Sequence, residues 1–242
     1  DHFGVANIFI EGKAPGLFWG YKTDGIIQEG DDVPQKSENK NTIAGSTDPG
    51  NIKFVDSNGD GMITEDDKVI LGDPNPDFTY GFQTRLTYKD ISLSASFNGV
   101  YGNDLLNSNL RYEAMPAKNS SNNIRKEVYA NIWRADNPTN LYPGVNSTNP
   151  SSAVLDRYIE DGSFLRCSDI TLGYTMPKSI VGKIGFENIN IFASVKNAFI
   201  ITNYSGYDPE VNTFAFDGLK RGVDMNSFPQ SRSYIFGLSV TF

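Results

Sequence analysis

Residues 77–101 read "DFTYGFQTRLTYKDISLSASFNGVY", and apolar and polar residues alternate along both halves of this stretch. Alternation at a period of two indicates a β-strand with one apolar face and one polar face. A very short turn around Lys89-Asp90 separates the halves, so the stretch predicts an antiparallel hairpin of two long strands. The predicted apolar rows are Phe78, Tyr80, Phe82, Leu86 and Tyr88 in the first strand, and Ile91, Leu93, Ala95, Phe97 and Tyr101 in the second.

Three further runs show the same period. One is the chain end "SRSYIFGLSVTF", and the other two, about 163–176 and 186–200, are joined by "PKSIVGKIG". The apolar register changes near Ser168-Asp169, which predicts a β-bulge there. A sixth, irregular strand is expected within about residues 5–20. These runs exceed the globular average of about 5–6 residues and match the roughly 9–11 residues of a tilted membrane-spanning strand.

The connections alternate in length. Long polar segments at about 21–77, 102–162 and 201–230 alternate with short turns at 89–90 and 177–185. Outer-membrane barrels have this arrangement, with short periplasmic turns and long extracellular loops. The sequence therefore predicts an all-β chain forming about six C-terminal strands of a large antiparallel transmembrane β-barrel. Six strands do not close a barrel, because the smallest single-chain bacterial barrels have about eight.

This topology also predicts the placement of the ends and loops. The long segments lie outside the cell, and the C-terminus lies on the periplasmic side. Two helical pieces are expected within the second loop, around 104–114 and 122–133.

The composition argues against several classes of function. The chain has 242 residues and a net charge of −8, which disfavours nucleic acid as a partner. His2 and Cys167 are its only histidine and cysteine, so neither a histidine-dependent nucleophile nor an intrachain disulfide is expected. No pair of carboxylates stands out as a glycosidase site, and we expect no enzyme. No run approaches the about 18 apolar residues of a transmembrane helix.

The stretch "VDSNGDGMITEDD" at 55–67 has the D-x-N-x-D-G pattern of a calcium-binding loop. Gly61 permits the sharp turn, and an aspartate at the last ligand position suits weak affinity, on the order of 10⁻⁴–10⁻³ M. Such a Ca²⁺ ion would staple the loop. The alternative is an Asx-rich turn that folds without metal. The predicted ligands are Asp56, Asn58, Asp60, the Met62 carbonyl, Thr64 and Asp67.

The chain resembles the C-terminal part of a SusC/RagA-type TonB-dependent outer-membrane transporter. The resemblance is carried by ordered segments along nearly the whole chain. Cys167 and Phe199-Ile200 are mild departures from the family pattern. The matching segments are "GLFWGYKTDGIIQ" (16–28), "IKFVDSNGDGMITEDDKVILGDPNPDFTYGF" (52–82), "YIEDGSFLRCSDITLGYTMP" (158–177), "NAFIITNYSGYDPEV" and "FPQSRSYIFGLSVTF".

The resemblance implies a barrel of about 22 strands with an N-terminal plug. Nothing in residues 1–242 matches a plug or a TonB box, so this part is expected to form barrel wall and loops. Such transporters import glycans or peptides across the outer membrane of Gram-negative Bacteroidota. A SusD-like lipoprotein forms their lid, and the TonB–ExbB–ExbD complex supplies the energy. The terminal Phe242 resembles the signature read by the outer-membrane assembly machinery.

Aromatic residues of the long loops are candidate contacts for an oligosaccharide or peptide. The alternative is that they pack their own loop or contact the lid. These candidates are Trp133, Tyr142, Tyr207 and Phe214. The rival function is a soluble, calcium-stabilised β-sandwich that binds carbohydrate, with shorter strands and with loops balanced at both ends.

Overall fold

The computed structural model describes residues 6–36, 47–114, 123–148, 153–211, 213–214, 217–218 and 220–242. Parts of the predicted loops at 37–46, 115–122 and 149–152 lie outside these residues. The chain divides into two compact units. Unit 1 comprises Asp1–Asn75, Asp104–Glu160 and Glu210–Ser227, and unit 2 comprises Pro76–Asn103, Asp161–Pro209 and Phe228–Phe242.

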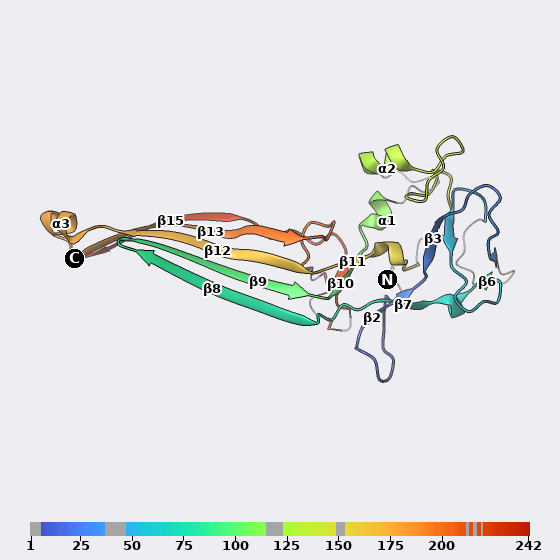
Figure 1. Cartoon of the computed structure of the whole chain (residues 1–242), viewed down its shortest axis with the longest axis horizontal. Coiled ribbons are helices and arrows are strands. Elements are labelled where there is room, and N and C mark those ends of the chain that lie inside the picture. Colours follow the sequence, from blue (N-terminus) through green and yellow to red (C-terminus); the bar gives the residue numbers. More distant parts are fainter. Residues whose placement is uncertain are drawn as a thin grey trace. The chain divides into compact units, whose positions relative to one another are not determined.

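Unit 2 is built on one five-stranded antiparallel sheet, whose long strands run side by side in Figure 1. It consists, in spatial order, of β15 (Ser233–Thr241), β13 (Asn188–Thr202), β12 (Phe164–Thr175), β9 (Ile91–Tyr101) and β8 (Phe78–Tyr88). The predicted hairpin is confirmed, because β8 and β9 pair from Phe78–Tyr101 to Tyr88–Ile91. Lys89 adopts a positive φ of 53° in the two-residue turn.

The bulge expected near Ser168-Asp169 is also confirmed. The register of β12 shifts between Cys167 and Asp169 against both of its neighbours. Cys167 is then opposite Phe97, and Ile170 is opposite Ala95. The bulge therefore places apolar residues that are out of step in the sequence on one face of the sheet. Between β12 and β13 lie the short helices α3 (Lys178–Val181) and η3 (Gly182–Ile184).

The expected sixth strand of this sheet is wrong. Residues 5–20 contain only the short strands β1 (Asn7–Ile8) and β2 (Leu17–Gly20), which belong to unit 1. There β2 lies between β1 and β7 (Val69–Gly72). Gly12 and Gly16 adopt positive φ between β1 and β2, and this turn ends the run before it reaches the length of a spanning strand.

The rest of unit 1 consists of short elements. The antiparallel pair β3 (Thr23–Ile26) and β5 (Ile52–Phe54) and the parallel pair β4 (Gln35–Lys36) and β6 (Met62–Ile63) come from the first long segment. A third sheet places β10 (Asp104–Asn107) between β11 (Ile159–Asp161) and β14 (Val223–Asp224). The helices are η1 (Glu65–Asp67), α1 (Leu110–Glu113), α2 (Lys126–Asn131) and η2 (Asp156–Tyr158).

The helix expected at 104–114 begins only at Leu110, because residues 104–107 form strand β10 instead. The helix expected at 122–133 contains α2. Among the described residues, none of the helices has both the length and the apolar character needed to traverse a membrane.

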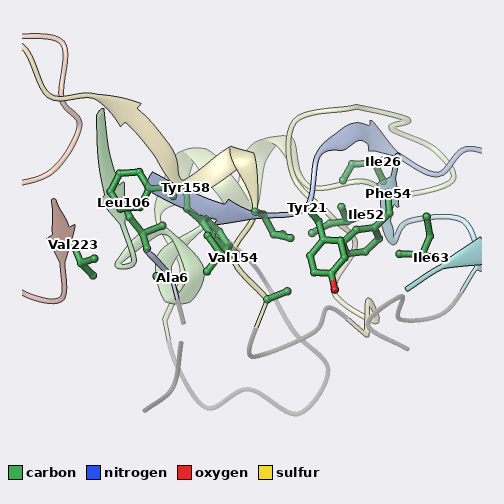
Figure 2. Packing of buried hydrophobic residues seen from close by; sticks show 13 residues of the cluster. Ala6, Tyr21, Ile26, Ile52, Phe54, Ile63, Leu106, Val154, Tyr158 and Val223 are labelled. Atoms are coloured by element: carbon green, nitrogen blue, oxygen red, sulfur yellow. The ribbon is translucent and has the colours of Figure 1, made fainter. Parts of the chain in front are cut away.

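Unit 1 has a core that its own segments supply (Figure 2). Tyr21 and Phe54 pack edge to face with ring centroids 5.9 Å apart. Leu106 and Val223 come from different long segments, yet their strands pair and both side chains are buried in one cluster. Burial of apolar surface thus joins stretches that are more than a hundred residues apart in the sequence.

Candidate functional site

The sheet of unit 2 carries most of its large apolar side chains on one exposed face, called the apolar face below, whereas Phe192 and Ile235 lie on the other. One row crosses all five strands through Leu86, Leu93, Leu172, Ala193 and Phe236. Leu93 is 40% exposed and Phe236 is 81% exposed. A contiguous apolar surface of this kind marks contact with another protein or with a membrane. Its other large exposed members are Phe78, Tyr80, Phe82, Tyr88, Ile91, Tyr101, Tyr174, Ile191, Phe199, Ile201, Tyr234 and Leu238.

Aromatic rings lie against glycines in this sheet. A Cβ on Gly99 would collide with the Tyr80 ring, whose hydroxyl donates to the Phe164 carbonyl at 3.2 Å. A Cβ on Gly237 would likewise collide with the Phe192 ring. Each ring therefore fills the space above a glycine of the neighbouring strand, which compensates for the missing side chain.

The opposite face of the sheet, called the polar face below, carries hydroxyl, amide and charged groups. The Asp169 carboxylate accepts hydrogen bonds from Thr171 and Ser194 hydroxyls, each at 2.9 Å. Thr171 also donates to Ser194 at 2.9 Å. Lys196 pairs with Asp169 in the ladder. Strands that are apolar on one side and polar on the other suit a wall between lipid and a wet interior.

A buried ion pair fixes the chain that follows β13. Arg166 Nη2 lies 2.6 Å from Asp208 Oδ1, and both side chains are almost completely buried. The second oxygen of Asp208 accepts from the backbone N–H of Gln230 at 3.2 Å. Both residues lie in segments that carry the family resemblance, but the sequence patterns did not pair them, because they are 42 residues apart.

The predicted calcium loop is folded around its own backbone amides. Asp56 accepts from the N–H groups of Gly59 and Gly61 at 2.6 and 2.7 Å. The bond from Gly61 is the main reason why the pKa of Asp56 is lowered. Asp60 accepts from Met62 N–H at 2.8 Å, and Asn58 accepts from Asp60 N–H at 2.8 Å.

Asp67 closes the loop from its other end. Its carboxylate is fully buried and accepts from the N–H groups of Ser57 and Thr64 at 2.9 and 2.7 Å. Thr64 and Asp67 also form a capping box at the start of η1, because the Thr64 side chain accepts from the backbone of the first turn and Asp67 accepts from the backbone of Thr64.

The donor atoms of the loop suit a cation, but their positions do not form a ligand cluster. Its donors are oxygens, which a hard cation such as Ca²⁺ prefers. Within the described residues, however, no three acidic, histidine or cysteine side chains converge as metal ligands. Calcium binding therefore stays a prediction, and the hydrogen bonds show that the loop has a defined turn geometry of its own.

The predicted aromatic contacts fall in different environments. Trp133 and Tyr142 are brought together, because the backbone N–H of Trp133 donates to the backbone carbonyl of Tyr142 at 3.0 Å. Tyr142 packs against a small cluster with Val128 and Ile132. Phe214 packs against the main core of unit 1, whereas Tyr207 belongs to unit 2 and is 73% exposed. Whether any of them contacts substrate stays a prediction.

Trp133 also lines a polar pocket with residues 48–51 and 144–148, which the sequence did not mark as a site. The available signals were the turn sequences "DPGN" at 48–51 and "YPGV" at 142–145, which indicate tight turns but not a cavity.

The chain is similar in sequence to curated receptors. It is 35% identical to TonB-dependent receptor P3 of Formosa agariphila over 245 residues, which covers 97% of this chain and 23% of that protein. It is 30% identical to TonB-dependent receptor SusC of Bacteroides thetaiotaomicron over 197 residues, which covers 78% of this chain and 17% of that receptor. The chain thus spans less than a quarter of the length of these relatives. No protein-family model matches it.

Solved structures show the same fold. The RagAB peptide transporter matches with a TM-score of 0.72 and 21% identity, over 99% of this chain and 25% of the matched chain. The RagAB peptide importer in the open-open state matches with a TM-score of 0.69 and 22% identity, over 99% of this chain and 24% of the matched chain. The mostly-β prediction agrees with this likeness, although the five described sheet strands do not close a barrel.

Proposed function

The chain belongs to the SusC/RagA-type TonB-dependent receptors, a family without enzymatic activity, and we propose that it supplies barrel wall and extracellular loops to an outer-membrane importer. The observation that carries this proposal is the apolar face of unit 2. Its strands have 9 to 15 residues, enough to cross the hydrocarbon layer, which takes about 9–11.

The proposed cargo is an oligosaccharide or a peptide. The likeness to a RagAB peptide transporter supports the peptide class. It also supports a second, SusD-like lipoprotein as the partner that covers the extracellular side. Energy would come from the TonB–ExbB–ExbD complex, acting through a part of the receptor other than barrel wall and loops.

The proposed orientation places the long segments outside the cell and the C-terminus in the periplasm. Unit 1 is drawn mainly from these segments, at Asp1–Asn75, Asp104–Glu160 and Glu210–Ser227. In this orientation a Ca²⁺ ion in the Asp56–Asp67 loop would be a structural ion of the outer surface, held by the predicted oxygen ligands.

The rival soluble sandwich is disfavoured by the architecture of unit 2. A sandwich covers the apolar face of one sheet with a second sheet. In the described part of unit 2, one sheet is present and its apolar residues remain exposed.

The proposal is tested in cells that carry or lack the full-length protein. We expect the protein in the outer-membrane fraction, and uptake of a fluorescent oligosaccharide or a fluorescent oligopeptide that requires the protein. An uncoupler of the proton gradient should abolish that uptake. Recovery of the protein from the soluble fraction, or equal uptake of both probes without it, would contradict the proposal.

A further inference from the structure

A polar pocket of about 680 Å³ lies within unit 1, between residues 48–51, Trp133-Arg134 and residues 144–148. Small-molecule sites usually have volumes of about 300–1,000 Å³, so the pocket is large enough for a ligand. Neither the apolar face nor the Asp56–Asp67 loop contributes to it.

Two glycines shape the floor of the pocket around the indole of Trp133. A Cβ on Gly50, whose φ is +91°, would lie 2.6 Å from Trp133 Cε3. Gly144 approaches the same ring atom, where a Cβ would lie at 3.4 Å, and its N–H donates to the Gly50 carbonyl at 2.8 Å. The indole N–H donates to Gln28 Oε1 at 2.9 Å. The ring is therefore locked in place by contacts from distant segments.

A second set of bonds fixes the wall. The buried Asn51 accepts from Thr148 N–H at 2.8 Å through Oδ1 and donates to the Asp48 carbonyl at 2.9 Å through Nδ2. The Ser147 N–H donates to the Gly144 carbonyl at 3.0 Å. Such cross-links hold the wall in place before a ligand arrives, which lowers the entropy cost of binding.

The lining identifies the chemistry of the ligand. The lining holds one acid and one base, Asp48 and Arg134, so its formal charge is zero, and Arg134 Nε also lies 3.4 Å from Asp136 Oδ1. Asn146, Ser147 and Thr148 bring amide and hydroxyl groups that both donate and accept. Pro49, Val145 and Trp133 add apolar surface. A neutral molecule with several hydroxyls and an apolar C–H face matches all three properties.

We propose that this pocket of unit 1 binds a neutral sugar ring of an oligosaccharide. The assignment rests on the proposed function, which leaves both oligosaccharide and peptide open as cargo, and the lining of this pocket favours the oligosaccharide. It goes further in naming a subsite, its residues and the neutrality of its ligand.

The test measures binding to the full-length protein in detergent micelles by saturation-transfer NMR. The probes are maltotriose, cellotriose and laminaritriose, with tetraglycine as the peptide probe. Val145→Trp fills the pocket from its exposed mouth, where Val145 is 52% exposed. Leu141→Trp is the matched control, because Leu141 is 57% exposed, lies four residues away and does not line the pocket.

We expect at least one trisaccharide to bind to the wild type and to Leu141→Trp, and to lose about tenfold or more in affinity with Val145→Trp. Asn146→Ala should weaken binding less, since it removes one hydrogen-bonding group and leaves the space open. No trisaccharide binding at millimolar concentration, or equal binding to both tryptophan variants, would overturn the assignment. So would selective binding of tetraglycine. If the wild type binds no trisaccharide but uptake is intact, only this subsite is refuted. If the wild type binds a trisaccharide but shows no uptake, only the transport function is refuted.

Discussion

Unit 1 and unit 2 treat apolar residues in opposite ways. Unit 1 has short strands and few regular elements, yet it buries a continuous cluster that includes Phe18, Leu106 and Leu155. Unit 2 has the longest strands of the chain, yet it leaves Leu93, Leu172 and Phe236 exposed. In this chain, long regular strands do not imply a buried core, and short strands do not exclude one. Unit 1 is stabilised by its own side chains, whereas the apolar face of unit 2 is left uncovered by the described residues.

Removal of a core ring from unit 1 should have the largest effect. Phe18 is fully buried, and Phe18→Ala should cost about 3–5 kcal/mol because it removes apolar contacts and leaves a cavity. Both tryptophans, Trp19 and Trp133, belong to unit 1, so the midpoint of unfolding by urea can be followed in this unit alone by their fluorescence. Phe9→Ala, at a residue that is 51% exposed, is the control. Equal effects of the two variants would mean that the core does not determine the stability of unit 1.

A charge on the apolar face of unit 2 should have the next largest effect, and only in lipid. Ala95→Arg, near the middle of β9, should destabilise the vesicle-inserted protein by about 2–4 kcal/mol, because an arginine near the middle of the bilayer is poorly solvated. Ser96→Arg places the same charge on the polar face of the same strand, opposite Asp169, and should cost much less. Urea titration of the inserted protein by circular dichroism measures both variants. If Ser96→Arg were the more harmful, the assignment of the two faces would be reversed.

This contrast also explains what the sequence could predict. Long strands carry their own period of two, so the hairpin at Lys89-Asp90 and the bulge at Ser168-Asp169 are visible in the residues alone. The strands of unit 1 have two to four residues, too few to show a period. Their partners are distant in sequence, as Leu106 and Val223 are.

The candidate sites follow the same division. The calcium loop is local, so the spacing of Asp56, Asn58 and Asp60 identifies it as a candidate. The polar pocket is formed by three segments that come together around Trp133. Contacts between segments distant in sequence leave no local sequence pattern, so the sequence did not predict the pocket. The strand expected within residues 5–20 is wrong, because Gly12 and Gly16 adopt positive φ and divide the run into two short strands.

High pH should weaken unit 1 through a buried tyrosine. Burial raises the pKa of Tyr158 to about 12, against about 10 in an unfolded chain. The folded state favours the neutral phenol, so this stabilisation is complete below about pH 10 and is lost as pH rises from there through about 12. Tyr158→Phe should flatten the fall in unfolding free energy over that range. Tyr21, whose pKa is also raised by burial, should account for the remaining dependence.

The smallest expected effect is that of calcium on unit 1. If the Asp56–Asp67 loop binds Ca²⁺, millimolar calcium should raise the unfolding midpoint of unit 1 by a few degrees relative to chelator, because a ligand stabilises the state that binds it. Asp56→Ala should remove this shift. Asp66→Asn, at an acid of the same loop that is not a predicted ligand, should retain it. A midpoint that ignores calcium would leave the loop as a turn held by its own amides.

The rings of Tyr80 and Phe192, which lie over Gly99 and Gly237, have a consequence for how this wall can evolve. Neither glycine can acquire a side chain while its ring remains, and loss of the ring alone uncovers bare backbone. Only Phe192 ring atoms block a Cβ at Gly237, so that ring and its glycine can change only together. A Cβ at Gly99 would also lie 2.5 Å from the Phe164 carbonyl oxygen, so Gly99 stays restricted even without the Tyr80 ring. Gly99 and Gly237 differ in this respect from glycines of the chain that stand in open space, such as Gly12 and Gly30, where only the backbone angle restricts replacement.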